Sequence, residues 1–295
     1  MNRELYLVGV TCTYNEAEMV PYVMPYVERM GYDKFIVYDN ESTDNTVELL
    51  KQYPFVEVRT YKTNGSFNDD YRTLKILSTL QEYHQLSHKN DKIYCFVNVD
   101  FDEVLFGTAR HTTPFKNWIR NRYIFAQENY FCDTMIDLFP KERNVDSEYY
   151  KNVRYPHLAE GMRCAYWASY GDKTTLIILN DFETIQITPG NHLIFLKPKE
   201  GKKLKNIKYS NELWGFHLKY INKSVIQKKH LNISKRYNKA SNESYANDID
   251  DIYDSLYTVS FPLSNFFEKI QLNRDSEESK LSGVFRFEDG QRIKE

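Results

Sequence analysis

Residues 5–46 read LYLVGVTCTYNEAEMVPYVMPYVERMGYDKFIVYDNESTDNT, and this stretch decides the fold. A β-rich run at 5–12 and a second apolar run at 35–38 (FIVY) enclose a segment with helical spacing at 16–30. Gly31 stands where a helix C-terminus is expected. Two short apolar strands joined by a helix predict parallel pairing through a right-handed crossover.

The same alternation continues to residue 99. TVELLKQY at 46–53 and the stretch 67–88 have helical character, whereas VEVRTY at 56–61 and IYCFVNV at 93–99 are typical of strands. We therefore predict an α/β fold with a Rossmann-like, doubly wound mixed sheet. In such sheets ligands bind beyond the carboxyl ends of the strands.

The second half of the sequence is less regular. Residues 115–170 are rich in aromatic side chains and predict short strands mixed with loops. Three further strands are predicted at 174–179, 184–187 and 192–196, and a basic helix at 222–240. The expected organisation is one domain at 1–240, divided into a regular half at 1–106 and an irregular half at 107–220, with a C-terminal extension at 241–295.

Composition excludes several classes of protein. The 295 residues are 41% hydrophobic and 27% charged, with a formal net charge of -2, which argues against a wholly basic nucleic-acid-binding protein and against an acidic disordered chain. No apolar run approaches the ~18 residues of a membrane span, and the N-terminal apolar run is too short for a secretory signal. The four cysteines form no CxxC pair, so a zinc site on cysteines is not expected and a cytoplasmic, reducing setting fits best.

Polar clusters follow three of the predicted strands. TYNE at 13–16, DNESTDNT at 39–46 and DFDE at 100–103 each begin where a strand ends. The carboxyl ends of parallel strands share one edge of a sheet, so the three clusters are expected to meet around one crevice.

DFDE places two carboxylates, Asp100 and Asp102, two residues apart after a buried strand. Carboxylate oxygens are hard ligands suited to Mg²⁺ or Mn²⁺, which keep several waters and take further ligands from a substrate diphosphate. The alternative is a solvated acidic turn. Because further apolar residues crowd the motif on both sides, the metal-binding interpretation is favoured.

In DNESTDNT, Ser42 or Thr43 is expected to be a helix N-cap, with Asp44 adding negative charge at the helix N-terminus. Asp39 at the strand end is not needed for capping. Its carboxylate is suited to accept a hydrogen bond from a nucleobase or a ribose hydroxyl.

In TCTYNE, Thr11, Thr13 and Tyr14 occupy a strand-to-helix turn, the usual position of a nucleotide, where Tyr14 is suited to stack on a base. The chain contains neither GxGxxG nor GxxxxGK[ST]. A dinucleotide-dependent dehydrogenase and a P-loop ATPase are therefore both disfavoured.

Together, TYNE, DNESTDNT and DFDE, in this order and spacing, resemble the family 2 glycosyltransferases, in particular the branch with a TxxNE first motif and a DxDE metal motif. The resemblance covers residues 5–106. It implies that the half at 1–106 binds the nucleotide sugar and that the half at 107–220 forms the acceptor side, where part of the aromatic excess at 115–170 would serve as platforms for sugar rings. It implies the GT-A fold and Mn²⁺- or Mg²⁺-dependent transfer of a sugar from a nucleotide diphosphate donor, with inversion, to a glycan or a lipid-linked glycan in surface polysaccharide or lipooligosaccharide synthesis.

The resemblance also implies roles for individual residues. Asp100 would face the ribose or sugar and Asp102 would bind the metal, while Asp39 would contact the base. Further donor-binding candidates are Thr11, Thr13, Tyr14 and Glu16 at the first motif and Asn68 and Arg72 near the diphosphate, with a surface helix arginine as the alternative for Arg72. His217, or alternatively His192, would complete the metal shell; a hydrogen-bonded sheet histidine is the other interpretation of each.

A carboxylate base is needed to deprotonate the acceptor hydroxyl. The acidic pair typical of the family is missing after the metal motif, which leaves Glu128, Asp133, Glu160 and Asp172, with Asp133 and Glu160 preferred. Lys173 is a candidate contact to the acceptor or the diphosphate, and a strand-edge lysine is the alternative.

Residues 197–239 are rich in Lys and Arg and contain only Glu200 and Glu212 as acids. The segment is either a solvated face or a surface that docks on an anionic membrane, which would place the protein peripherally on the inner membrane face. No nucleic acid is expected as a partner.

Two other activities remain open. A nucleotidyltransferase that activates a sugar phosphate would have a related sheet, but such enzymes usually open with a Gly-rich, basic loop that TCTYNEAE lacks. A non-catalytic module that binds a nucleotide sugar is the third possibility.

Overall fold

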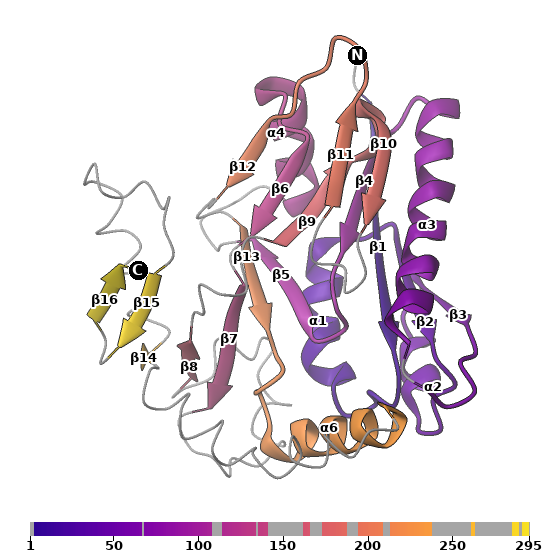
Figure 1. Ribbon diagram of the computed structural model, residues 1–295. Coiled ribbons are helices and arrows are strands. Elements are labelled where there is room, and N and C mark those ends of the chain that lie inside the picture. The colour runs from indigo at the N-terminus through magenta and orange to yellow at the C-terminus, as the bar shows by residue number, and fades with distance from the viewer. Residues whose placement is uncertain are drawn as a thin grey trace. The chain divides into compact units, whose positions relative to one another are not determined.

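The computed structural model describes most of the first two thirds of the chain and short parts of the rest (Figure 1). The described residues are 3–66, 68–107, 114–133, 135–140, 162–165, 173–187, 194–208, 213–237, 261–262, 285–288 and 291–294. The chain forms two compact units, one of Met1–Thr134 with Asp172–Trp214 and one of Met135–Gly171 with Gly215–Glu295. The domain boundary predicted at residue 240 lies outside the described residues.

The first unit is built on a seven-stranded mixed sheet in the order β12-β6-β9-β4-β1-β2-β3. Its parallel part consists of β1 (Leu5–Thr13), β2 (Lys34–Asp39), β3 (Val56–Thr60) and β4 (Ile93–Asn98), with β1 between β2 and β4. These are the four strands predicted from the apolar runs. The prediction of an α/β fold with a mixed sheet is thus confirmed. The carboxyl ends of the four parallel strands lie at one edge of this sheet.

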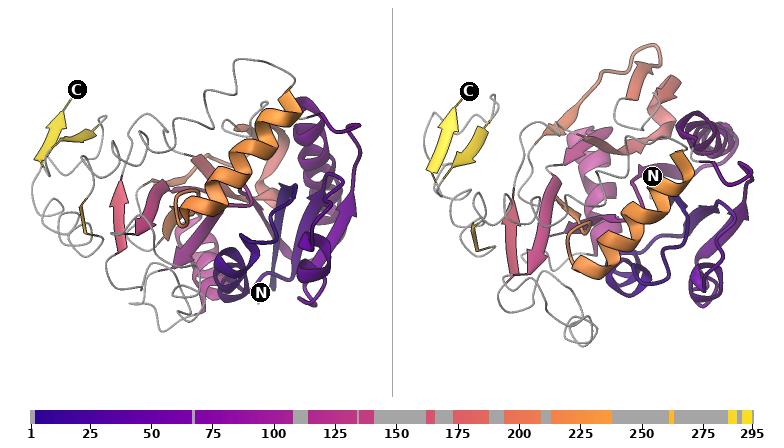
Figure 2. Two further views of the ribbon diagram at one scale, coloured as in Figure 1. Left: turned by 90° about the horizontal axis from the view of Figure 1, so that it is seen from below. Right: turned by 60° about the horizontal axis from the view of Figure 1, so that its bottom comes forward.

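Successive side chains of β1 and β2 point to opposite faces of the sheet, and both faces are buried. Val8, Val10 and Ile36 face a cluster formed with Ile76 and Leu80 of α3 (Asp69–Lys89). The helices of this unit lie on both sides of the sheet in the views of Figure 2. Two buried faces explain why these strands are continuous apolar runs rather than alternating ones.

The helices of the parallel part follow the sequence with shifted ends. α1 (Val20–Met30) begins four residues later than predicted, since residues 17–19 form a turn and Pro21 lies in the first helical turn; it ends at Gly31, whose φ of 71° is left-handed. α2 (Thr46–Leu50) is a single short helix. α3 agrees with the prediction to within two residues at its N-terminus and one at its C-terminus.

The sequence prediction was wrong for the start of the aromatic-rich region. Residues 115–126 form the helix α4 (Phe115–Ala126) rather than short strands and loops. Its buried Trp118 and Ile119 lie on one side of the helix, and Trp118 stacks on Phe115 and packs against Phe131. Aromatic residues of this helix therefore serve its packing.

Antiparallel strands extend the sheet beyond β4. β9 (Lys173–Ile178) pairs antiparallel with both β4 and β6 (Tyr130–Asp133), and β12 (Asn206–Lys208) adds to β6 in parallel. A short 3₁₀ helix, η3 (Leu179–Asp181), leads into the hairpin of β10 (Phe182–Ile187) and β11 (Ile194–Pro198). β5 (Glu103–Gly107) begins at the last residue of the DFDE motif.

The buried Asp181 joins these additions. Its carboxylate accepts hydrogen bonds from the Tyr123 hydroxyl (2.8 Å) and the Asn129 amide (3.2 Å), and Lys202 Nζ lies 3.0 Å away. Three partners compensate for the burial of one charge.

The second unit contains β7 (Met135–Pro140), β8 (Met162–Ala165), β14 (Phe261–Pro262), α6 (Lys223–Tyr237) and residues 215–217 of β13 (Leu213–His217). β8 pairs antiparallel with β7 and β14, and β13 pairs parallel with β7. A two-stranded antiparallel sheet of β15 (Phe285–Glu288) and β16 (Gln291–Lys294) lies near the C-terminus. In the part of the chain that the structure describes, no helix is long and apolar enough to cross a membrane.

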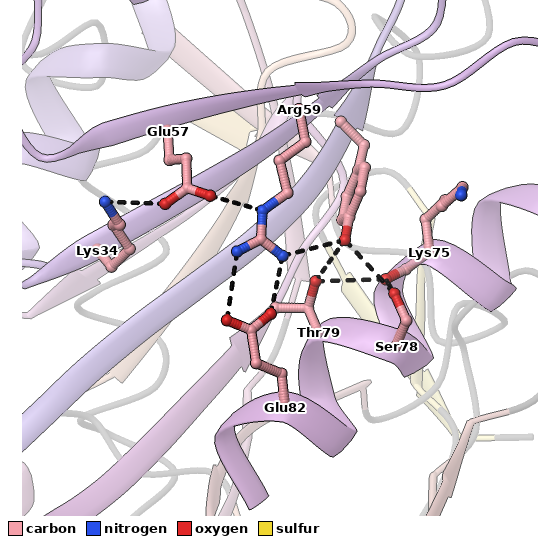
Figure 3. A network of polar contacts seen from close by, with 8 residues as sticks. Lys34, Glu57, Arg59, Lys75, Ser78, Thr79 and Glu82 are labelled. Atoms are coloured by element: carbon pink, nitrogen blue, oxygen red, sulfur yellow. Dashed lines mark hydrogen bonds and ion pairs between the residues drawn. The ribbon is translucent and has the colours of Figure 1, made fainter. Parts of the chain in front are cut away.

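A polar network fixes the edge strand β3 to its neighbours (Figure 3). Arg59 contacts Glu57 at 2.6 Å and Glu82 of α3 at 2.9 Å, and it donates to the Tyr38 hydroxyl at 3.3 Å. Lys34 of β2 completes the row at 2.9 Å from Glu57. A charged row of this kind also protects the edge from pairing with another chain.

The Lys34 contact predicts a measurable pKa change. The hydrogen bond from Lys34, aided by Arg59, lowers the pKa of Glu57 below its ordinary value. A carboxylate with a lowered folded-state pKa stabilises the fold above its ordinary pKa of about 4.3, and this contribution is lost as the pH falls through the lowered value. Lys34→Met should therefore raise the pKa of Glu57, as measured by carboxyl ¹³C NMR. The exposed Lys51→Met should leave that pKa unchanged.

Gly9 generates a second prediction. A Cβ at this position would lie 2.5 Å from the ring of Phe35, the register partner of Gly9 on β2, and 2.7 Å from the ring of Tyr32. Gly9→Val should therefore destabilise the protein by about 1–3 kcal/mol through overpacking. Urea unfolding measures the loss, and the exposed Thr60→Val serves as control. Equal stability of the two variants would contradict the close packing.

Candidate functional site

The first and second polar motifs bind to each other. Three consecutive backbone amides of the loop after β1 donate to side chains of the loop after β2. The bonds run from Asn15 N to Ser42 Oγ (2.9 Å), from Glu16 N to Thr46 Oγ1 (2.8 Å) and from Ala17 N to Asp44 Oδ2 (3.2 Å). The two loops therefore form one rigid wall at the carboxyl edge of the sheet.

Return contacts reinforce this wall. Asn15 Oδ1 accepts from the Thr43 amide at 2.7 Å, and Asp44 Oδ1 accepts from the Thr46 amide at 3.0 Å. Neither Ser42 nor Thr43 is the N-cap, since α2 begins after Asn45. The expected capping role is therefore wrong, and the two side chains bond to the first loop instead.

Left-handed backbone conformations occur in the loops that follow the first three strands. Asn15, Glu41 and Asn64 have φ values of 53°, 60° and 53°, and they follow β1, β2 and β3 in turn. Left-handed conformations are uncommon in residues other than glycine, and such residues often occur at functional sites.

Asp39 and the two threonines form a buried polar group. Thr13 and Asp39 are register partners on β1 and β2, and Thr11 lies on the same face as Thr13. All three are buried, and Thr11 Oγ1, Thr13 Oγ1 and Asp39 Oδ1 have no hydrogen-bond partner in the protein. The other oxygen, Asp39 Oδ2, accepts from the Ser42 amide at 3.1 Å. A polar ligand would satisfy the three remaining oxygens.

The DFDE motif forms a tight turn between β4 and β5. Asp100 N donates to Glu103 Oε2 at 2.8 Å, and Glu103 N donates to Asp100 O at 3.0 Å. Asp102 is 5% exposed, and Asp100 is paired with Arg72. Glu103 thus positions the turn that presents the two aspartates, a role that its identity in the motif did not reveal.

Arg72 lies in the first turns of α3, where it contacts Asp69 at 3.6 Å as well as Asp100. It also influences Cys12 at the end of β1: burial raises the pKa of the Cys12 thiol to about 11, and Arg72 acts in the opposite direction. Arg72 is therefore not a plain surface arginine but lies between the ends of β1 and β4.

Asn68 caps α3, because its side chain accepts from Tyr71 N at 3.0 Å. Capping is a structural role that explains an asparagine at this position. Binding of the donor by Asn68 stays a prediction. Tyr14 is half-buried and Glu16 is buried, both in the wall formed by the first two loops. Their predicted donor contacts are likewise untested.

Of the acceptor-side candidates, Asp133 and Lys173 are register partners on the antiparallel pair of β6 and β9. The pairing places the two sequence candidates opposite each other on neighbouring strands. Glu128 lies 3.5 Å from Arg122 in an ion pair. Glu160, Asp172 and His192 lie outside the described residues.

His217 belongs to the second unit, where its Nδ1 lies 2.8 Å from Asp137 Oδ1. The two residues are register partners on β13 and β7, and Asp137 is buried. The arrangement is that of a hydrogen-bonded sheet histidine, and a carboxylate on one ring nitrogen is also how metal-binding histidines are oriented. The predicted metal role of His217 stays a prediction.

The metal prediction depends on Asp100 and Asp102. Within the described residues, no group of three or more His, Cys, Asp and Glu side chains is placed to hold a metal ion. Two hard carboxylates at one turn still fit Mg²⁺ or Mn²⁺, which take much of their shell from water and phosphate.

The basic segment at 197–239 makes several contacts within the protein. Lys197 pairs with Glu183 at 2.7 Å, Lys202 with Asp181 at 3.0 Å, and Lys199 donates to the carbonyl of Asn180 at 2.7 Å. These lysines therefore have structural partners. Docking of the segment on an anionic membrane stays a prediction.

No family model and no curated protein matches the chain. Among solved structures, it is similar to a 4-diphosphocytidyl-2C-methyl-D-erythritol synthase from Anaerococcus prevotii, with 10% identity and a TM-score of 0.26 over 48% of this chain and 58% of that chain. A cytidylyltransferase from Leptospira borgpetersenii aligns with 13% identity and a TM-score of 0.23 over 45% and 54% of the two chains. HddC from Yersinia pseudotuberculosis aligns with 12% identity and a TM-score of 0.22 over 59% and 74%.

The chain thus spans less than two thirds of the synthase and of the cytidylyltransferase. A cytidylyltransferase belongs to the nucleotidyltransferases, the alternative class of the sequence prediction, rather than to the glycosyltransferases. At these TM-scores the alignments carry no argument about activity.

The bonds between the first two loops are testable with one isosteric change. Thr46→Val leaves the buried Glu16 amide without its acceptor, which should cost about 1–3 kcal/mol of stability. Thr43→Val, at an exposed position in the same loop, is the control and should cost much less. Chemical unfolding of both variants measures the difference, and equal losses would show that the Glu16 amide does not depend on Thr46.

Proposed function

We propose that this protein is a metal-dependent glycosyltransferase that takes a sugar from a nucleotide diphosphate donor. The observation that carries the proposal is the group of buried, unpartnered oxygens of Thr11, Thr13 and Asp39, at the sheet edge where the carboxylates of the DFDE motif also emerge. Leaving three such atoms without partners costs free energy, so a bound base or ribose that donates to them would be strongly stabilised.

In this proposal Asp39 Oδ1 accepts from the nucleobase or ribose, while the Ser42 amide holds the carboxylate in place through Oδ2. Thr11 and Thr13 would contribute their hydroxyl groups to the same ligand. The hydrogen bonds between the first two loops order these loops without a ligand, which reduces the ordering cost of binding.

Asp100 and Asp102 would hold Mn²⁺ or Mg²⁺ together with the donor diphosphate. The cation would offset the negative charge that develops on the leaving nucleoside diphosphate. Arg72 is placed to add a second positive charge, because its present partner Asp100 is itself a donor-site carboxylate. Binding of a diphosphate would then allow Arg72 to share its hydrogen bonds between Asp100 and the phosphate oxygens.

The acceptor half of the reaction needs a base that takes the proton of the attacking hydroxyl. Asp133 is the proposed base on β6, with Lys173 opposite it on β9. An inverting single displacement requires the acceptor to attack the face of the sugar opposite the diphosphate. A glycan or a lipid-linked glycan is the proposed acceptor.

Nucleotidyl transfer is the second candidate, since the carboxylates and the base pocket fit it equally well. The loop after β1 distinguishes the two. A nucleoside triphosphate needs donors in this loop, but the amides of Asn15, Glu16 and Ala17 already donate to Ser42, Thr46 and Asp44. The Asp44 carboxylate would also repel a triphosphate there. These contacts favour glycosyl transfer.

The deciding experiment compares the two donor classes directly. The full chain is incubated with Mn²⁺ and either a panel of nucleotide sugars or nucleoside triphosphates with sugar 1-phosphates, and products are identified by mass spectrometry. Release of nucleoside diphosphate supports glycosyl transfer. Release of pyrophosphate with formation of a nucleotide sugar would overturn it in favour of nucleotidyl transfer.

Asp102→Asn tests the metal site. It removes one charge while keeping the shape of the buried side chain, so the fold should remain and Mn²⁺-dependent binding of a nucleoside diphosphate should weaken at least tenfold. Calorimetric titration with and without Mn²⁺ measures the change. Glu48→Gln on α2 is the control, and an Asp102→Asn protein with unchanged metal dependence would exclude this motif as the metal site.

A further inference from the structure

A pair of histidines stands at the C-terminal end of α3, one helical turn apart. His84 and His88 are four residues apart on one side of the helix, their ring centroids are 4.6 Å apart, and their Nε2 atoms approach to 3.3 Å. His84 is half-buried and His88 is exposed, so solvent reaches the pair. Residues at this spacing are neighbours on a helix surface.

A third electronegative atom lies beside the ring of His84. The backbone carbonyl oxygen of Phe182, the first residue of β10, lies 2.8 Å from His84 Nε2. The side chain of Phe182 is fully buried, which fixes the position of this carbonyl. Residues about a hundred positions apart in the chain therefore meet here, where α3 lies beside β10 (Figure 1).

The separations match those of metal ligands. Two nitrogens bound to one tetrahedral Zn²⁺ at about 2.0–2.1 Å are about 3.3–3.4 Å apart, and smaller angles at the metal bring ligand pairs closer. The observed 3.3 Å between the imidazole nitrogens matches this separation, whereas the 2.8 Å from His84 Nε2 to the carbonyl oxygen requires a smaller angle at the metal than the tetrahedral one. Imidazole nitrogens are preferred ligands of Zn²⁺ and similar first-row ions.

We propose that His84 Nε2, His88 Nε2 and the carbonyl oxygen of Phe182 form a Zn²⁺ site that cross-links α3 to β10, with water as the remaining ligand. In the metal-free protein the single proton of the neutral His84 ring is on Nε2 and is shared with the Phe182 carbonyl. Binding of the ion requires Nε2 to give up this proton to solvent while Nδ1 takes one up, so that each ligating ring stays neutral with its single proton on Nδ1.

Lys199 competes with the metal. Its Nζ lies 3.0 Å from His88 Nδ1 and 2.7 Å from the carbonyl of Asn180. An ammonium group that donates to Nδ1 requires a lone pair there, whereas metal ligation through Nε2 of a neutral ring requires a proton on Nδ1. Zn²⁺ binding must therefore displace Lys199 from His88, and removing this lysine should strengthen binding.

This site is distinct from the donor site of the proposed function. It lies at the C-terminal end of the 21-residue helix α3, whereas Arg72 lies near the N-terminal end. It also uses imidazoles, which suit Zn²⁺, rather than the carboxylates that suit Mg²⁺ and Mn²⁺. Failure of either proposal would leave the other intact.

The test is calorimetric titration of the full chain with Zn²⁺, in parallel with its effect on the melting temperature. We expect one site for Zn²⁺ that also raises the melting temperature, because the ion binds only the folded arrangement. His88→Gln, a change at an exposed position, should weaken binding at least tenfold, as should His84→Gln. Asp102→Asn should leave it unchanged, and Lys199→Met should strengthen it.

The proposal is overturned if wild-type protein binds no Zn²⁺ at millimolar concentration, or if His88→Gln binds as tightly as wild type. Loss of the site in Asp102→Asn would assign the bound ion to the DFDE motif instead and would equally overturn it. Weaker binding in Lys199→Met would contradict the competition between Lys199 and the metal. It would mean that Lys199 instead helps to hold His88 in the position that binds the ion. If His84→Gln fails to fold because it loses the hydrogen bond to the Phe182 carbonyl, His88→Gln still tests the proposal.

Discussion

The carboxyl edge of the sheet depends on hydrogen bonds from the loop after β1 to the loop after β2. Three successive amides, at residues 15–17, donate to side chains of residues 42–46. Parallel pairing of β1 with β2 brings the loops to the same edge, but it does not fix their conformation. The cross-loop bonds do, and they hold Asn15 in a left-handed conformation that a free loop would rarely adopt.

This constraint has a chemical consequence. Amides that bind protein acceptors are not available to a phosphate, so the first loop is a wall and not an anion cradle. The unsatisfied acceptors lie instead on the strand ends, at Thr11, Thr13 and Asp39. Side-chain oxygens at strand ends suit a neutral, hydrogen-bonding ligand such as a base or ribose. In the proposed function, a donor diphosphate would take its positive charge from Arg72 and from a cation held by the DFDE turn.

The sequence predicted the parallel half of the fold well because both faces of that sheet are buried. Continuous apolar runs and the polar motifs that end them located β1 to β4 within one or two residues. The prediction failed at α4, where the abundance of aromatic residues suggested strands. The spacing of Phe115, Trp118 and Ile119 was the available helical signal, and Pro114 precedes the helix.

Side-chain roles were harder to predict than positions. That Asp39 lies at a strand end follows from the sequence, but that one of its oxygens is used by Ser42 and the other is left over requires the loop conformation. The Arg72–Asp100 pair and the register that places Asp133 opposite Lys173 also join distant parts of the sequence. No local pattern encodes such contacts, because they depend on how separate strands and helices are arranged in the sheet.

The helix α3 connects these features. Its first turn carries Asp69 and Asp70 and its last turn His88 and Lys89, a charge distribution that complements the helix dipole. Twenty-one residues at about 1.5 Å each make the helix about 30 Å long, so its two ends lie in different chemical environments. The N-terminal end positions Arg72 against the Asp100 carboxylate, which a diphosphate would replace in part in the proposed function. The C-terminal end carries the imidazoles of His84 and His88, and an ion bound there as proposed would hold α3 to β10 without occupying the donor site.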